Sequence, residues 1–215
     1  MAFIDTIAPA DATGEVEAMY RRQQNKFGYV PNYAKVFCHR PELMKLWADL
    51  QVGIRRHVDP RRFELVTLAA AHALGSSYCS LAHGKLLTEH YPAEQVQRIA
   101  SEADPAPLTP AERAMVRYAR KVARDASSVT ADDVAELKAQ GLTDAEIFDI
   151  AAMAAGRAFL SKLVDGLGAE PDAAYLEVDE GLRAALTVGR PIDEAAPERL
   201  PEPAEAPIPA GAAPG

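Results

Sequence analysis

Apolar residues recur at the three- and four-residue spacing of an amphipathic helix in several stretches of this chain. Residues 41–54 form one such stretch. The side predicted to face inward consists of Leu43, Leu46, Trp47, Leu50 and Ile54. A later stretch that follows Thr143 has a predicted buried side of Ile147, Ile150, Met153, Ala154, Phe159 and Leu163. The pattern predicts a succession of packed helices.

Helix-start signals divide this pattern into elements. Asp59-Pro60 pairs an N-cap residue with a proline at the first helical position, which predicts a helix from Pro60 to Leu74. Thr109 and Thr143 are each followed three residues later by a glutamate, the arrangement of a capping box, so a helix should begin after each of them. Shorter helices are predicted over 13–22, 33–38, 92–100 and 130–140.

Composition supports an all-α fold of compact helices. Apolar residues make up 48% of the chain, with many Ala and Leu and few aromatic rings, which favours packed helices over a sheet. We expect an N-terminal arm and short helix over 1–24 and a helical domain over 25–180. Residues 181–215 form an acidic, Pro- and Ala-rich tail that we expect to be disordered, because it cannot bury enough apolar area to offset its ordering entropy.

Charge and cysteine usage narrow the class of protein. The formal net charge is −8 and no basic stripe is visible, which argues against nucleic acid as a partner. The first residues lack a basic segment followed by an apolar core, and no apolar run is long enough to cross a membrane. Two cysteines do not make a disulfide framework. We therefore expect a cytoplasmic protein with no membrane partner.

The stretch from Glu64 to Leu87 concentrates the candidate chemistry. It is rich in Ala and Leu, yet it contains a carboxylate, a thiol and two imidazoles, in Glu64, His72, Cys79 and His83. These groups can move protons or attack an electrophile near neutral pH. At about 100° per residue, all four would share one face of a continuous helix.

The helix is expected to break at Gly75-Ser76-Ser77. A second helix opening at Ser76 or Ser77 would place Cys79 in its first turn, where the unpaired N–H groups and the helix dipole favour the thiolate. His83 would lie one turn further along, beside the Cys79 side chain. A thiol with a neighbouring base would result.

The spacing of Glu64, Ser76-Ser77-Tyr78-Cys79 and His83 resembles the core motif of the alkylhydroperoxidase D-like family, also called the carboxymuconolactone decarboxylase family. That motif reads Glu, eleven residues, Cys-x-x-Cys, three residues, His. Ser76 stands where the family has its first cysteine. Residues 28–32, 39–43 and 141–168 also resemble the peroxidase-related branch.

The resemblance implies a homo-oligomer with a peroxidase-like oxidoreductase activity on a hydroperoxide. In that chemistry Glu64 and His83 form a relay that accepts the proton of Cys79, and the thiolate becomes a sulfenic acid. Ser76 rules out the family's dithiol–disulfide cycle. An external thiol, or Cys38, would then have to reduce the sulfenic acid.

Two other functions stay open. The same family includes lactone decarboxylases, so Glu64 and His83 could serve a non-redox acid/base enzyme that acts on a small organic acid. A non-catalytic helical binding protein, with the acidic tail as its interaction segment, is the third. In that case Cys79 would be an ordinary buried thiol.

Four further residues could have either a structural or a functional role. Ser76 is a helix cap or a hydrogen-bond donor to the thiolate, and Tyr78 is a packing residue or a phenol that lines the pocket. His72 is a hydrogen-bonded core histidine or a site member, and Cys38 is a small core residue or a substitute resolving thiol. The spacing matches no metal-ligand pattern, so we expect neither a metal nor a cofactor.

Overall fold

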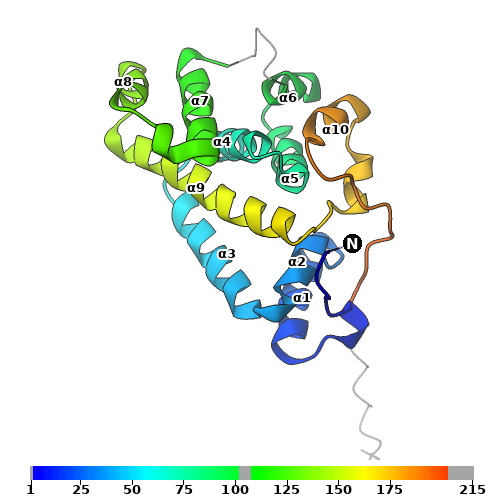
Figure 1. Ribbon diagram of the computed structural model, residues 1–215. Coiled ribbons are helices and arrows are strands. Elements are labelled where there is room, and N and C mark those ends of the chain that lie inside the picture. The colour runs from blue at the N-terminus through cyan, green and yellow to red at the C-terminus, as the bar shows by residue number, and fades with distance from the viewer. Residues whose placement is uncertain (1, 102–107, 203–215) are drawn as a thin grey trace, which may run out of the picture.

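The computed structural model describes residues 2–101 and 108–202, and this part of the chain contains helices and no strand (Figure 1). The fold is all-α, as the sequence predicted. The α-helices are α1 (Gly14–Phe27), α2 (Asn32–Val36), α3 (Pro41–Arg55), α4 (Pro60–Ala73), α5 (Ser77–Leu87), α6 (Ala93–Ala100), α7 (Pro110–Asp125), α8 (Ala131–Ala139), α9 (Asp144–Gly166) and α10 (Glu180–Leu186). The short 3₁₀ helices are η1 (Pro9–Asp11), η2 (Phe37–His39), η3 (Ala126–Ser128) and η4 (Ala173–Glu177). None of the described helices is long and apolar enough to cross a membrane.

The predicted helix starts are present with their capping hydrogen bonds. The Asp59 side chain accepts from the backbone N–H of Arg62 at the start of α4. Thr109 and Thr143 each form the full reciprocal capping box, with Glu112 and Glu146. These bonds satisfy backbone donors that have no partner inside the helix, which is why such short sequence signals located the elements.

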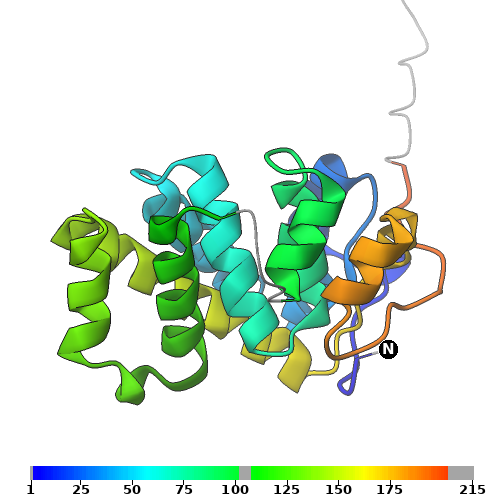
Figure 2. The same ribbon diagram turned by 90° about the horizontal axis from the view of Figure 1, so that it is seen from above.

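Helix α4 forms the centre of the larger core. Every residue from Phe63 to Ala71 is buried, and α4 packs against α5, α7 and α9 (Figure 2). A second, smaller core lies where α1, α2 and α3 meet the end of α9. The long helix α9 contributes to both cores, and it spans the molecule from α8 towards α2 (Figure 1).

Helix α3 begins where it was predicted and Trp47 is buried as predicted, but part of its predicted inner side is exposed. Its inner side is formed by Met44 and Trp47, whereas Leu46 and Leu50 are 61% and 53% exposed. Helix α3 packs on α9, η2 and α1, and these neighbours leave part of its apolar face uncovered. Leu43, also predicted to lie inside, is exposed as well.

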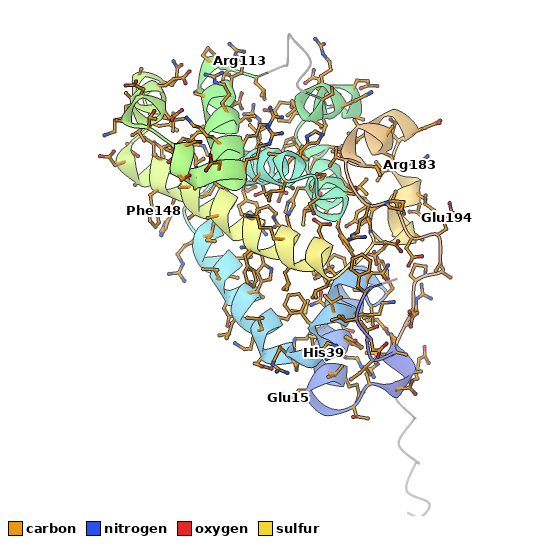
Figure 3. The ribbon with its side chains drawn as sticks, in the orientation of Figure 1. Glu15, His39, Arg113, Phe148, Arg183 and Glu194 are labelled. Carbon is orange, nitrogen blue, oxygen red and sulfur yellow. The ribbon has the colours of Figure 1, made fainter. Side chains whose placement is uncertain are left out.

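Helix α9 follows its prediction at Ile147, Ile150, Met153 and Ala154, which are buried. The prediction that Phe159 is buried was wrong, because this residue is exposed. Its ring packs against the ring of Trp47, and the two ring centroids are 5.4 Å apart. Phe148 likewise lies on the outer side of α9 (Figure 3).

The prediction of a disordered tail from residue 181 does not hold for residues 181–202. Helix α10 packs on α5 and α6, and residues 187–202 then form an extended strap across the surface. The backbone N–H of Gly189 donates to Ser77 Oγ at 2.7 Å, and Glu198 forms an ion pair with Lys35. Leu200 is buried in the smaller core. Residues 203–215 lie outside the described residues.

Candidate active site

The turn between α4 and α5 brings the motif residues into position. Gly75 adopts a left-handed conformation with φ of 69°, which a side chain would disfavour, and it reverses the chain after α4. Helix α5 then begins at Ser77 with Ser76 as its N-cap residue, and Cys79 lies in its first turn. His83 follows one turn later on the same helix.

Glu64 of α4 and His83 of α5 form a buried pair. Glu64 Oε2 lies 2.6 Å from His83 Nδ1, and the Phe63 ring lies edge-on beside the imidazole. The pKa of His83 is lowered to about 4, chiefly because burial disfavours the charged ring and next because the Arg157 cation is near. The imidazole is therefore neutral near pH 7. Its Nδ1–H donates to the carboxylate, which leaves Nε2 as the acceptor.

Cys79 is 3% exposed, and its sulphur contacts a cation from α9. Arg157 Nη1 lies 3.5 Å from the Cys79 sulphur, and the Arg157 side chain is itself almost completely buried, with 6% of the residue exposed. The structure thus adds Arg157 to the candidate site. The sequence signal for it was weak, because Arg157 is simply the one charged residue in the apolar stretch 150–160.

Arg157 has no carboxylate partner in the described part of the chain. Among the residues that the structure describes, none of the ion pairs involves Arg157, and its Nε has no hydrogen-bond partner. The Trp47 ring centroid lies 5.9 Å from the guanidinium carbon and supplies a weak cation–π contact. A buried cation is costly unless it is compensated, and the Cys79 sulphur is the group that the Arg157 Nη1 contacts.

The accessory residues divide into two groups. Ser76 and Tyr78 lie at the start of α5, but the Ser76 side chain makes no capping hydrogen bond. His72 and Cys38 are used elsewhere. His72 Nε2 lies 3.3 Å from the carbonyl oxygen of Ala185 in α10, and Cys38 is a free thiol packed in the smaller core beside Tyr20.

The Tyr78 phenol serves a second buried carboxylate, Asp172, that the sequence did not reveal. Tyr78 Oη donates to Asp172 Oδ2, and the backbone N–H of Asn32 donates to Asp172 Oδ1 at 2.7 Å. Burial raises the pKa of Asp172. The rings of Tyr33 and Tyr175 meet the Tyr78 ring at right angles or nearly so. Tyr78 therefore connects α5 to the segment after α9.

Two cavities of the described structure lie away from the thiol. One of about 20 Å³, the size of a single water molecule, is bounded by Asp172 and by the strap. A shallow groove of about 360 Å³ runs along the basic side of α7. Neither is lined by Cys79 or His83, which neighbouring side chains cover. In the described part of the chain, no cluster of His, Cys, Asp and Glu could hold a metal ion.

Known proteins share part of this sequence pattern and this fold. Residues 41–121 match the model of the carboxymuconolactone decarboxylase family. A search of curated proteins found no match. A peroxidase-related protein from Ralstonia eutropha JMP134 with an alkylhydroperoxidase AhpD core is 22% identical, with a TM-score of 0.70 over 88% of this chain and 98% of that chain.

Two further solved structures are similar in fold. A peroxidase-related protein from Silicibacter sp. TM1040 is 20% identical, with a TM-score of 0.72 over 82% of this chain and 94% of that chain. The debrominase Bmp8, solved as a cysteine-to-alanine variant in complex with 2,3,4-tribromopyrrole, is 18% identical. Its TM-score is 0.64 over 86% of this chain and 95% of that chain. This chain thus carries the carboxymuconolactone decarboxylase family pattern over residues 41–121, on the all-α fold of alkylhydroperoxidase D-like proteins.

Proposed function

We propose that this protein is a thiol-dependent oxidoreductase that reduces a hydroperoxide at Cys79. The observation that carries the proposal is the contact of 3.5 Å between the Arg157 guanidinium and the Cys79 sulphur. A cation beside the sulphur is the kind of neighbour that reactive cysteines have, and the thiolate is the nucleophilic form of cysteine. A merely structural cysteine would need no such neighbour.

Glu64 and His83 supply the proton relay. Neutral His83 accepts the thiol proton at Nε2, directly or through a water molecule, while its Nδ1–H stays hydrogen-bonded to Glu64. The carboxylate fixes the tautomer and stabilises the imidazolium that forms. Because burial and Arg157 oppose that imidazolium, the proton is readily passed on to the leaving group.

The redox step transfers one oxygen atom. The Cys79 thiolate attacks the terminal oxygen of the hydroperoxide, so that a sulphur–oxygen bond forms and the O–O bond breaks. Cys79 is oxidised to a sulfenic acid, and the peroxide is reduced to an alkoxide that takes the proton from His83 and leaves as an alcohol. Two electrons pass from sulphur to the peroxide.

Regeneration requires an external thiol. Ser76 cannot resolve the sulfenic acid, and Cys38 is packed in the smaller core against Tyr20. A low-molecular-weight thiol condenses with the sulfenic acid, releases water and forms a mixed disulfide. A second thiol molecule then restores Cys79 and leaves as the oxidised disulfide.

The test is turnover with defined substrates. The consumption of tert-butyl hydroperoxide would be followed with dithiothreitol as the reductant, for the wild type and for Cys79→Ser and Cys38→Ser. We expect Cys79→Ser to abolish turnover and Cys38→Ser to retain it. Turnover that persists in Cys79→Ser would contradict the proposal.

A second candidate is an acid/base enzyme of the decarboxylase type. The Glu64–His83 pair is complete without the thiol, and Ser76 removes the family's second redox sulphur. That function predicts activity on a small organic acid that survives Cys79→Ser but not Glu64→Gln. The debrominase shows a further substrate class on this fold, so halogenated aromatic compounds belong in the same assay panel.

A further inference from the structure

The first turn of α5 has backbone donors with no hydrogen-bond partner in the described part of the chain, and the Asp165 carboxylate lies next to the N-cap residue, Ser76. Ser76, Ser77 and Cys79 are all buried, and the Ser76 side chain makes no capping bond. Among the hydrogen bonds of the described residues, none has the backbone N–H of Ser77, Tyr78 or Cys79 as its donor. Buried N–H groups of this kind are normally satisfied, so this end of α5 suits an anion.

Arg157 provides an independent positive group at the same place. Its Nη1 lies 3.5 Å from the sulphur of Cys79, in the first turn of α5, and its Nε is buried without a hydrogen-bond partner. The guanidinium therefore has donor capacity that the described side chains do not use. The helix end and the guanidinium meet at Cys79.

A second arginine lies on the outer side of the site. The guanidinium of Arg55, an exposed residue, lies 4.6 Å from the centroid of the Phe63 ring, and that ring packs on His83. His83 is the most exposed of the three motif residues, at 8%. Arg55 and Arg157 thus both lie near the motif residues. Both arginines also lower the pKa of His83, as expected for a positive field at the ring.

We propose that the first turn of α5 and Arg157 form an anion site, which selects electrophiles that carry a carboxylate or another oxyanion next to the atom that Cys79 attacks. The proposal rests on the proposed function only in requiring that Cys79 be a reachable nucleophile. It narrows the substrates from hydroperoxides in general to acidic ones. The N–H groups and the guanidinium bind the oxyanion, and the thiolate attacks the adjacent atom.

Two alkylating reagents of nearly equal size test this charge preference. Iodoacetate is anionic and iodoacetamide is neutral, and with each the sulphur–carbon bond forms as the carbon–iodine bond breaks and iodide leaves. Both react with the same thiolate, so the ratio of their rates does not depend on how much thiolate is present. The rates would be measured by mass spectrometry on the peptide that contains Cys79, with N-acetylcysteine as the reference.

The anion site predicts an iodoacetate-to-iodoacetamide rate ratio at Cys79 about tenfold higher than that of N-acetylcysteine, because a buried cation close to the reagent is weakly screened. Arg157→Lys should keep most of the preference, and Arg157→Gln should lose it. Arg62→Gln is the matched control, since Arg62 pairs with Glu146 away from the thiol, and its ratio should stay at the wild-type value. Circular dichroism would establish that each variant is folded.

The wild-type ratio decides the question even if Arg157→Gln does not fold. A wild-type ratio equal to that of N-acetylcysteine, with iodoacetamide still modifying Cys79, overturns the anion site and leaves the thiol oxidoreductase standing. If neither reagent modifies Cys79 in the folded protein, the thiol is not a reachable nucleophile, and the proposed function and the anion site both fail.

Discussion

The guanidinium of Arg157 lies 3.5 Å from the sulphur of Cys79, although the two residues are 78 positions apart in the sequence. The contact joins α9 to the first turn of α5, and the strap is bonded to the same turn through Gly189 and Ser77. The local motif provides the thiol, the imidazole and one carboxylate. The cation that sets their charge balance comes from the second half of the chain.

The carboxylate of Glu64 should be essential for turnover. In Glu64→Gln, the amide no longer fixes the His83 tautomer by accepting from Nδ1, nor does it stabilise an imidazolium. We expect the rate of hydroperoxide reduction to fall by roughly 10²- to 10⁴-fold, the usual contribution of positioned acid–base catalysis. Steady-state kinetics with tert-butyl hydroperoxide would measure the change.

Glu112→Gln is the matched control for that variant. Glu112 is also a buried carboxylate, but it belongs to the capping box of α7 and to a hydrogen bond with Tyr91. Its replacement should lower stability without changing turnover per folded molecule. Equal losses of turnover in the two variants would show that Glu64 matters only for folding.

His83 should make the protein less stable in acid. Its pKa is about 4 in the folded state and 6.5 ordinarily, so between these values the unfolded chain binds a proton that the folded chain does not. Stability is therefore lost as the pH falls from 6.5 towards 4, by about 3 kcal/mol from this group. The raised pKa of Asp172 acts in the opposite sense, because the folded state takes up its proton first.

Urea denaturation at pH 7.5 and pH 4 would isolate the His83 contribution. His83→Gln should lose less stability than the wild type between the two pH values, because its side chain does not titrate. An identical loss in both proteins would mean that His83 keeps an ordinary pKa. The same low value predicts no fall in turnover from protonation of His83 between pH 5 and pH 8.

Restoring the missing cysteine should change the redox cycle. Ser76→Cys would recreate the family spacing at the start of α5, with the new thiol as the N-cap residue and Cys79 in the first turn. We expect hydroperoxide to convert this pair to a disulfide, seen in intact-mass spectra as the loss of two hydrogens. Persistence of a sulfenic acid at Cys79 in this variant would argue that the two positions cannot bridge.

The strap should depend on a glycine at position 189. A Cβ atom there would lie 2.1 Å from the carbonyl oxygen of Gly75, a backbone atom in the α4–α5 turn. Gly189→Ala should cost roughly 1–3 kcal/mol through overpacking, measured by urea denaturation. Gly53→Ala in α3 is the control, since a Cβ atom meets nothing within 4 Å there and alanine favours the helix. Equal stability of Gly189→Ala and the wild type would contradict the packing.

The parts of the fold that could be predicted are those with local causes. Capping at Asp59, Thr109 and Thr143 depends on residues three positions apart, and the break at Gly75 depends on one left-handed residue. The same locality placed Cys79 in the first turn of α5. Glu64 and His83 were paired through a motif of fixed spacing.

The parts that were missed depend on contacts between distant segments. Arg157 reads as an ordinary helical arginine until α9 packs beside α5, and Asp172 is a loop residue until Tyr78 reaches it. The strap has the composition of a disordered tail, and it is fixed by side chains that its own sequence does not contain, such as Ser77 and Lys35. Periodicity likewise could not show that the neighbours of α3 would cover only part of its apolar face.

Trapping the oxidised thiol would show whether Cys79 itself reduces the hydroperoxide. The wild-type protein would be mixed with one equivalent of tert-butyl hydroperoxide in the presence of dimedone, and the peptide containing Cys79 would be examined by mass spectrometry. We predict a dimedone adduct on Cys79 within seconds, and a slower reaction in Arg157→Gln. No sulfenic acid or mixed disulfide at Cys79, in a protein that remains folded, would contradict the account.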